Sequence, residues 1–285
     1  MFNLNFITAI VAAVLQAHSV VLDKAALSVK NVSYKTYTVI SFPLFTAFTL
    51  IIFLIFRPPL SLGLFGGWLG CLLWLSIAIA IINNLIFYRA LDQDRLGEMQ
   101  TIELLRYLPI ILFSGLFLAS ERKILVLAPA LVAALAIIWS HWQKNRFKMV
   151  KSTRLFLVWS LLTAPLAAII AKTLLNSWNP ISFELVCSSI MTLVFGLAFF
   201  KHSQHIPTRA WFLLLITNLL SAVAWILFYF SYQQLGIIYT TLLFSLQPLL
   251  VYFASVVFLK EPWQTKKAIA FIVVLACIVF SQIVS

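Results

Sequence analysis

Acidic side chains are scarce in this sequence. Asp and Glu account for 8 of the 285 residues, and all charged residues together make up only 10%. A water-soluble domain usually carries about a quarter of its residues as charged groups, so the scarcity excludes an ordinary soluble protein. Hydrophobic residues make up 63% of the chain instead. They form apolar runs of about 17 to 25 residues, the length that crosses a bilayer as a helix.

Cysteines and catalytic motifs are also rare or absent. The three cysteines, Cys71, Cys187 and Cys277, lie far apart inside apolar runs, so neither a disulfide framework nor a CxxC metal site is indicated. No GxSxG, P-loop or HExxH pattern occurs. We therefore expect no enzyme activity, no cofactor and no metal. Continuous Leu, Ile, Phe and Val runs favour helices over the alternating strands of a membrane barrel.

Basic residues outnumber acidic ones and give a formal net charge of +12. In a soluble protein this excess would suggest a nucleic-acid partner. Here Lys and Arg lie mostly in short connections between apolar runs, so membrane topology explains them better and no nucleic acid is expected. The N-terminus has no basic segment before its first apolar run, which favours a first transmembrane helix over a cleaved signal peptide. We expect a multi-pass protein of the cell (inner) membrane.

The apolar runs predict ten membrane-spanning helices. Their centres lie near residues 14, 47, 76, 108, 132, 164, 190, 220, 248 and 275. The longest polar break, residues 141–154, divides them five and five. We expect a first five-helix repeat over residues 1–143, a basic connection over 144–154 and a second repeat over 155–285. Because five is odd, the second half enters the membrane from the opposite side, which predicts inverted repeats.

Four features recur in the same order in both halves. They are a lysine at the end of the first helix, a glycine after the third helix, a proline twelve residues later, and a glutamate twelve or thirteen residues after the proline. The residues are Lys24, Gly97, Pro109 and Glu121 in the first half and Lys172, Gly236, Pro248 and Glu261 in the second. This recurrence indicates an internal duplication.

With these positions the sequence resembles the ten-helix, EamA-like members of the drug/metabolite transporter (DMT) superfamily. The resemblance rests on the five-plus-five plan, on the lysine that ends the first helix of each half, and on a fourth helix per half that contains proline and closes with glutamate. It implies an all-α integral membrane protein of ten transmembrane helices in two inverted five-helix repeats. It also implies a carrier with a central cavity that moves small metabolites such as amino acids.

The fourth predicted helix carries charges inside the membrane. At about 100° per residue, Gln100, Glu103, Arg106 and Tyr107 fall on one face. A charge at the bilayer centre costs about 2.5 to 3.5 kcal/mol, so Glu103 and Arg106 should face the bundle interior or a wet cavity. As i, i+3 neighbours they can pair. The pair either fixes helix packing or belongs to a substrate site, in which Arg106 binds an anion and Glu103 binds an amine or a proton.

Other polar residues of the spans complete the candidate site. Asn218 and Trp225 share one face of the eighth helix, and Ser245 aligns with Arg106 when the two prolines are superposed. Interhelical hydrogen bonds are the simpler role for the amides, and kinks are the simpler role for Pro109 and Pro248. The full set of predicted substrate-binding residues is Gln100, Glu103, Arg106, Tyr107, Asn83, Asn218, Trp225, Tyr239, Ser245 and Gln247. Proton coupling is assigned to Glu103 or His18.

The function that these observations favour is secondary active transport of a small polar or amphipathic metabolite by alternating access. The expected partners are a small-molecule solute and the lipid bilayer. The alternative is a non-transporting membrane module that handles lipid or acts as an assembly partner, with the polar face serving helix packing.

The distribution of basic residues predicts the orientation of the chain. Fifteen of the twenty Lys and Arg follow odd-numbered spans, four follow even-numbered spans, and Arg106 lies within a span. Because basic residues in short loops stay in the cytoplasm, both termini should lie outside it, whereas the family resemblance implies termini inside. We predict that a C-terminal reporter that matures only outside the cytoplasm will be active. Activity of a cytoplasm-only reporter at the same position would contradict the count.

Overall fold

The computed structural model describes residues 4–60, 62–94, 96, 99, 103, 105–122, 124–141, 150–202, 206–258, 263 and 265–284, and these residues form helices and connections without a strand. The first half contains α1 (Leu4–Leu27), α2 (Tyr34–Phe56), η1 (Leu62–Phe65), α3 (Gly67–Gln93), α5 (Tyr107–Phe117), η2 (Ala119–Glu121) and α6 (Ile124–His141). The second half contains α7 (Lys151–Leu175), α8 (Pro180–Phe199), η3 (Phe200–His202), α9 (Thr208–Leu235), α10 (Ile237–Phe244), α11 (Leu246–Phe258) and α12 (Thr265–Val284). Each of the ten predicted centres falls within one of these helices.

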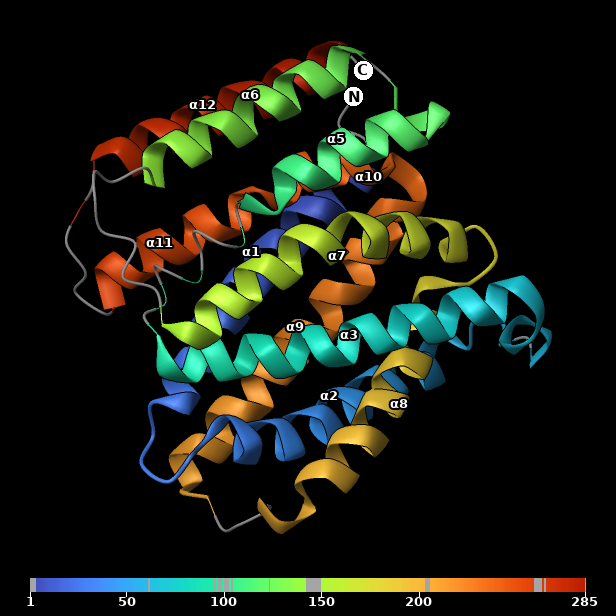
Figure 1. Ribbon diagram of the computed structural model, residues 1–285, viewed down its shortest axis with the longest axis vertical. Helices are drawn as coiled ribbons and strands as arrows, with labels where there is room; N and C mark the ends of the chain where they lie inside the picture. The colour runs from blue at the N-terminus through green and yellow to red at the C-terminus, as the bar shows by residue number, and fades with distance from the viewer. Residues whose placement is uncertain are drawn as a thin grey trace.

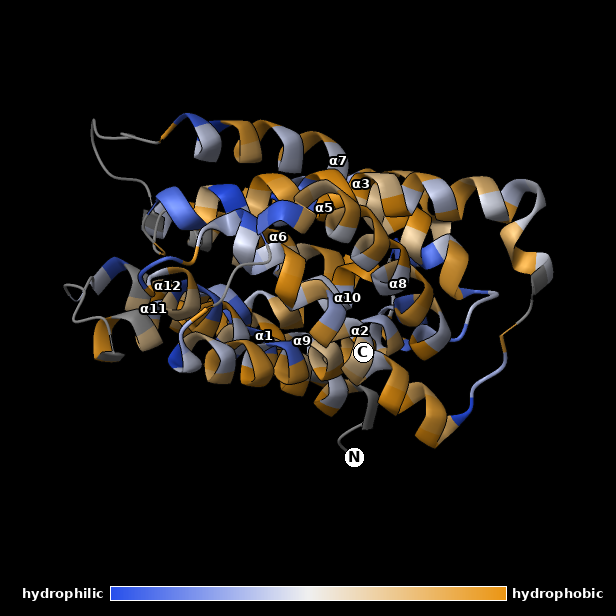
Figure 2. Cartoon of the chain, turned by 90° about the horizontal axis from the view of Figure 1, so that it is seen from below, coloured by the Kyte–Doolittle hydropathy of each residue, from blue (hydrophilic) through white to orange (hydrophobic). Residues whose placement is uncertain are grey.

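The outer surface of the bundle is apolar. Among the described residues, seven helical segments are long and apolar enough to cross a membrane, namely α1, α2, α3, α7, α8 with η3, α9, and α10 with the first part of α11. Phe56, Leu197 and Ile283 each expose more than two thirds of their surface. Such exposure suits a lipid environment and is rare in a soluble monomer. Figure 2 shows hydrophobic residues along most of the helices. The chain is a multi-pass helical membrane protein.

Two helices, α2 and α8, begin at capping residues that the sequence supplies. At the start of α2, the side chain of Ser33 accepts a hydrogen bond from the backbone N–H of Thr36 at 3.3 Å. At the start of α8, the side chain of Asn179 accepts from the N–H of Ile181 at 2.9 Å, and Pro180 occupies the first helical position. Both arrangements satisfy N–H groups that the first helical turn leaves without a partner.

The fourth helical segment of each half is broken next to its proline. Pro109 is the third residue of α5, which begins after the turn at Arg106, and Pro248 is the third residue of α11, which begins after the break at Ser245. Proline lacks an N–H and clashes with the carbonyl four residues before it, so it is tolerated in a first turn and not inside a continuous helix. The two breaks fall at the positions that align when the prolines are superposed.

Helices from the two halves pack against one another in pairs. α1 packs on α9 and α7 packs on α3, while α2 packs on α8 and α6 on α12. Figure 1 shows α6 and α12 side by side along one edge of the molecule, and α2 with α8 along the opposite edge. α1, α3, α7 and α9 occupy the middle of the bundle.

Two lysines hold the ends of the middle helices. The Nζ of Lys24 donates hydrogen bonds of 2.7 Å to the carbonyls of Leu91 and Asp94 at the end of α3. The Nζ of Lys172 donates to the carbonyls of Tyr232, at 2.7 Å, and Gln233, at 3.1 Å, at the end of α9. The last carbonyls of a helix have no intrahelical donor, so each ammonium group supplies them with hydrogen bonds. Its positive charge also interacts favourably with the negative end of the helix dipole.

A buried glutamate caps the start of α10. The two carboxylate oxygens of Glu121 accept hydrogen bonds from the N–H of Ile237 at 2.8 Å and of Ile238 at 3.1 Å. The preceding residue, Gly236, has a φ of 87°, a conformation that L side chains rarely adopt. A Cβ on Gly236 would lie 2.6 Å from a Glu121 oxygen, so glycine is what allows the carboxylate to approach the helix end.

This contact predicts that Gly236→Ala destabilises the protein. The methyl group meets Glu121 and the backbone is strained, at a cost of about 1 to 3 kcal/mol. The matched control is Gly196→Ala in α8, where an added Cβ meets nothing within 4 Å and alanine is the better helix former. Thermal unfolding in detergent should show a lower midpoint for Gly236→Ala and an unchanged or higher one for Gly196→Ala. Equal midpoints for the two variants would contradict the capping role.

Candidate functional site: a central polar cavity

The middle of the bundle encloses a cavity of about 260 Å³. Its described lining comes from α1, α2, α3, α5, α7, α8, α9, α10 and α11, and from the residues that precede α5. Four lining residues carry ionisable charge of fixed sign: the carboxylates of Asp23, Glu103 and Glu184 and the guanidinium of Arg106. If all four are ionised, negative charge exceeds positive charge. All three carboxylate residues are buried.

The predicted ion pair is formed and faces this cavity. Arg106 and Glu103 make a direct salt bridge one helical turn apart, with side chains 18% and 7% exposed. The guanidinium carbon lies 5.7 Å from the ring centre of Tyr107, and the Tyr107 hydroxyl donates to the side-chain oxygen of Gln247 at 3.5 Å. The buried Nε of Arg106 has no hydrogen-bond partner among the described residues. This N–H group is therefore unsatisfied within the described part of the chain.

A hydrogen-bond network surrounds Asp23 where α1, α2 and α9 meet. Its carboxylate accepts from the hydroxyl of Tyr37 at 2.5 Å and from the hydroxyl of Thr217. The hydroxyl of Ser19 lies 2.8 Å from that of Thr217 and 2.6 Å from that of Ser221. These bonds join side chains of the first and second halves, and they give the buried carboxylate the donors that hydrocarbon lacks.

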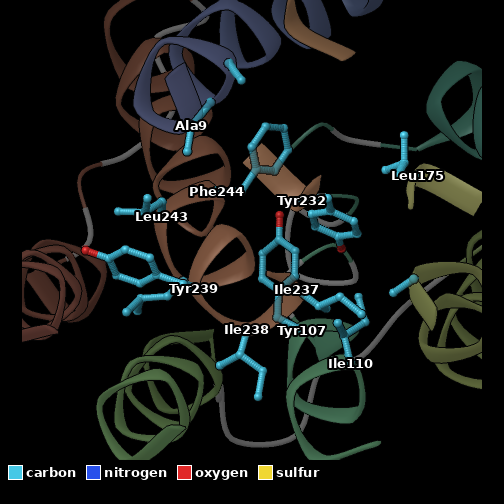
Figure 3. Close-up of a cluster of buried hydrophobic side chains, with 14 of the residues drawn as sticks. Ala9, Tyr107, Ile110, Leu175, Tyr232, Ile237, Ile238, Tyr239, Leu243 and Phe244 are labelled. Atoms are coloured by element: carbon cyan, nitrogen blue, oxygen red, sulfur yellow. The ribbon is translucent and has the colours of Figure 1, made fainter. Parts of the chain in front are cut away.

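An aromatic wall lines the cavity along α9. The ring centres of Trp225 and Tyr229 are 5.9 Å apart, and those of Phe228 and Tyr232 are 4.4 Å apart. Phe244 of α10 packs on Phe228 with ring centres 4.6 Å apart. Figure 3 shows the Tyr107, Tyr232 and Phe244 side chains gathered on one side of α10.

The carboxylates are spread along the cavity. Asp23 bonds to Thr217, whereas Phe183, the residue before Glu184, packs on Tyr229 with ring centres 5.1 Å apart. Thr217 and Tyr229 are twelve residues apart on α9, which corresponds to about 18 Å at a rise of 1.5 Å per residue. Arg106 lies over the ring of Tyr107, which Figure 3 shows on the same side of α10 as Tyr232, one turn beyond Tyr229. The ion pair and Glu184 therefore face the same part of α9, and Asp23 faces another part.

Seven of the residues predicted to bind substrate line the cavity. They are Asn83, Glu103, Arg106, Tyr107, Asn218, Trp225 and Gln247. Asn218 also accepts a hydrogen bond of 2.7 Å from Ser41 of α2, so it serves the helix packing as well. Gln100 lies outside the residues that the structure describes.

Three predicted site residues are not part of the lining. Tyr239 is buried among hydrophobic residues, and Figure 3 shows its ring on the side of α10 away from Tyr232 and Phe244. Ser245 is buried and donates to the carbonyl of Leu242 at the helix break, 2.6 Å away. His18 is exposed on α1, with its Nδ1 2.8 Å from the carbonyl of Val14. Tyr239 and Ser245 were predicted from their position near a proline break, and His18 from its position in the first span. Sequence spacing does not show which neighbouring helix each side chain faces.

Asp23 and Glu184 are cavity residues that the sequence reasoning did not select. Asp23 lies near the end of the first span, and Glu184 is the fifth residue of an otherwise uncharged span. The signal that could have found them is the one used for Glu103, namely a carboxylate inside a segment that crosses the membrane.

Comparison with known proteins agrees with the fold. Residues 151–282 match the model of the EamA-like transporter family. A crystal structure described only as "Crystal structure of protein" has a TM-score of 0.74 to this chain at 13% sequence identity and covers 98% of this chain and 96% of its own. At that identity the likeness shows the fold alone. A comparison with curated proteins found no match.

The fold and the cavity define a helical membrane protein with a polar chamber between its two halves. The family match confirms the resemblance to the EamA-like members of the drug/metabolite transporter superfamily, and it supports a membrane transporter. Members of that family are transporters rather than enzymes. The match names neither a substrate nor a mechanism.

The Asp23 network predicts the effect of removing one of its donors. Tyr37→Phe leaves a buried carboxylate with one hydrogen bond fewer, which should cost about 1 to 3 kcal/mol. The control is Tyr34→Phe on the same helix, because the Tyr34 hydroxyl makes no hydrogen bond within the described part of the chain. Unfolding midpoints in detergent should fall for Tyr37→Phe only. A similar change in both variants would remove Asp23 from the interactions that hold α1, α2 and α9 together.

Proposed function

We propose that the chain is a secondary active transporter that moves a small polar or amphipathic metabolite, such as an amino acid, across the cell (inner) membrane by alternating access. The observation that carries this proposal is the cavity in the middle of the bundle, which contains the Glu103–Arg106 ion pair. An ion pair inside a membrane protein is seldom retained for stability alone, because desolvation of both charges offsets their attraction. The alternative, a non-transporting module in which the polar face serves helix packing alone, does not account for a cavity beside that face.

The packing of the helices supports an inverted repeat over residues 1–143 and 155–285, joined by the basic connection 144–154. Exchanging the two halves turns the α1·α9 contact into the α7·α3 contact and leaves the α2·α8 and α6·α12 contacts as they are. This is the pattern that an approximate two-fold axis produces. In Figure 1, α6 and α12, the last helices of the two halves, run side by side in opposite directions, as corresponding parts of inverted halves do. The family match to residues 151–282 covers nearly the whole second repeat.

The broken helices place backbone groups beside the solute path. Arg106 lines the cavity at the break before α5, and Gln247 lines it just after the break before α11. Irregular backbone inside a membrane is tolerated where it borders protein or a wet cavity, and transporters commonly bind their solutes there. In this proposal the two halves rock about the cavity, so that it opens first to one side of the membrane and then to the other.

The cavity also supports the class of solute. Its volume of about 260 Å³ suits a small molecule. Arg106 can bind a carboxylate, Glu103 can bind an amine or a proton, and Asn83, Asn218 and Gln247 offer amide groups. The aromatic wall of α9 provides a surface for the apolar part of an amphipathic solute.

The proposal predicts that Arg106→Ala and Glu103→Gln each abolish flux while the protein still folds. Removing one partner leaves the other charge buried and unpaired and removes a solute contact. The measurement is uptake of radiolabelled zwitterionic amino acids, supplied as a mixture, into proteoliposomes. Arg106→Lys keeps the positive charge but loses the planar guanidinium and its paired N–H donors, so it should retain only a minor fraction of the wild-type rate.

A matched control lies on the lipid-facing side of α5, the helix that follows the ion pair. Leu116→Ala changes a residue that is 63% exposed and should leave the flux unchanged. Size-exclusion profiles verify that each variant is folded. Wild-type flux in Arg106→Ala and Glu103→Gln would remove the ion pair from the site. Wild-type protein that moves none of the supplied amino acids above the leak of empty liposomes would contradict the proposed solute class.

A further inference from the structure

Glu184 is a buried carboxylate that takes no part in the Glu103–Arg106 ion pair. It belongs to α8, lines the cavity and is 5% exposed. No described residue donates a hydrogen bond to it, and no described positive charge interacts with it. Cys187 on the same helix and Tyr229 on α9 are the titratable neighbours that it influences. A carboxylate in this position is stable only when something supplies a positive charge or a proton.

The surroundings of Glu184 suit a particular kind of positive charge. Its sequence neighbour Phe183 packs edge-to-face on Tyr229, with ring centres 5.1 Å apart, and Tyr229 lies against Trp225. All four residues line the cavity. A carboxylate next to aromatic faces is the arrangement that binds organic ammonium groups, because the faces of the rings carry negative charge density.

A metal ion is less well matched to this place. Within the described residues no group of three or more His, Cys, Asp and Glu side chains could hold a metal. A hard cation needs six or so oxygen ligands, and Glu184 offers two beside apolar rings. An ammonium group needs fewer oxygens, and its attached carbon atoms can contact the rings.

The position of Glu184 relative to Arg106 extends this argument to the solute. Phe183, next to Glu184 in the chain, packs on Tyr229. Arg106 lies against Tyr107, which Figure 3 shows on the same side of α10 as Tyr232, one helical turn further along α9. The two opposite charges therefore face neighbouring parts of the same aromatic wall. A small molecule lying on that wall could reach both.

We propose that Glu184, together with Phe183, Trp225 and Tyr229, forms a cation subsite of the cavity that binds the ammonium group of the transported solute. The inference rests on the proposed transport function and adds to it a residue and a chemical class. Glu184 takes the amine in this arrangement, and Arg106 takes an anionic group where the solute has one.

The test uses three probes that share a phenyl ring and differ in charge: phenethylamine, phenylacetate and 2-phenylethanol. Their dissociation constants are measured by titration calorimetry with the purified full-length protein in lipid nanodiscs. Wild-type protein should bind phenethylamine at least about tenfold more tightly than 2-phenylethanol, because hydrogen bonds to a charged group add to the shared ring contact. Glu184→Gln should remove this preference and leave the affinity for 2-phenylethanol unchanged.

Three variants separate the subsite from a general loss of structure. Glu184→Asp keeps the charge and should keep the preference for phenethylamine. Trp225→Leu leaves the carboxylate in place and should weaken phenethylamine binding more than 2-phenylethanol binding. Asp92→Asn changes a carboxylate at the end of α3 that accepts from the backbone of Tyr34 and lies outside the cavity, so it should have no effect.

The inference is overturned if wild-type protein binds phenethylamine no more tightly than 2-phenylethanol, or if Glu184→Gln binds it as wild type does. Failure of the proposed function gives a different result. In that case phenethylamine binding depends on Glu184, and proteoliposomes show no flux of any labelled amino acid.

Discussion

Hydrocarbon offers no hydrogen-bond partner, and this one constraint determines where the polar groups of this chain lie. The backbone meets it by forming helices. Polar side chains meet it by turning inward, and four charged residues line one cavity. The cavity carboxylates are stabilised in different ways: Glu103 forms a salt bridge with Arg106, and Asp23 accepts hydrogen bonds from two hydroxyl groups. Glu184 has neither, and we therefore assign it to the ligand.

The same constraint explains the ends and breaks of the middle helices. A helix that ends inside or near the membrane leaves carbonyl and N–H groups without partners. Lys24 and Lys172 supply donors to the ends of α3 and α9, and Glu121 supplies acceptors to the start of α10. Glu121 reaches from the first half to the second, so the cap also ties the halves together. The ends of the broken helices are thus held by specific contacts while the cavity between them stays polar.

Hydrophobicity made the general fold predictable from the sequence. Each of the ten apolar runs contains a described helix, and seven described segments are long and apolar enough to cross a membrane, which confirms the all-α membrane class. The Glu103–Arg106 pair was also predictable, since its two residues are one turn apart on one helix. Orientation relative to the membrane stays a prediction.

Contacts between helices were not predictable in the same way. Tyr239, Ser245 and His18 have the polar character of site residues, yet the packing of their helices turns them away from the cavity. Glu184 was missed because its span is otherwise apolar, and Asp23 because it lies near the end of its helix. Which face of a helix meets the cavity depends on the neighbours that cover its other faces, and no single segment carries that information.

The central claim is that a water-filled chamber surrounds the buried charges, and its accessibility tests it most directly. In a chain whose three cysteines are replaced by alanine, Ser221→Cys places a thiol on the cavity lining, and Leu116→Cys places one on the lipid-facing surface. The rate of labelling by a small, charged, membrane-impermeant thiol reagent is measured for both in proteoliposomes. The account predicts that Cys at 221 reacts and Cys at 116 does not. An unreactive thiol at 221 that behaves like the one at 116 would contradict it.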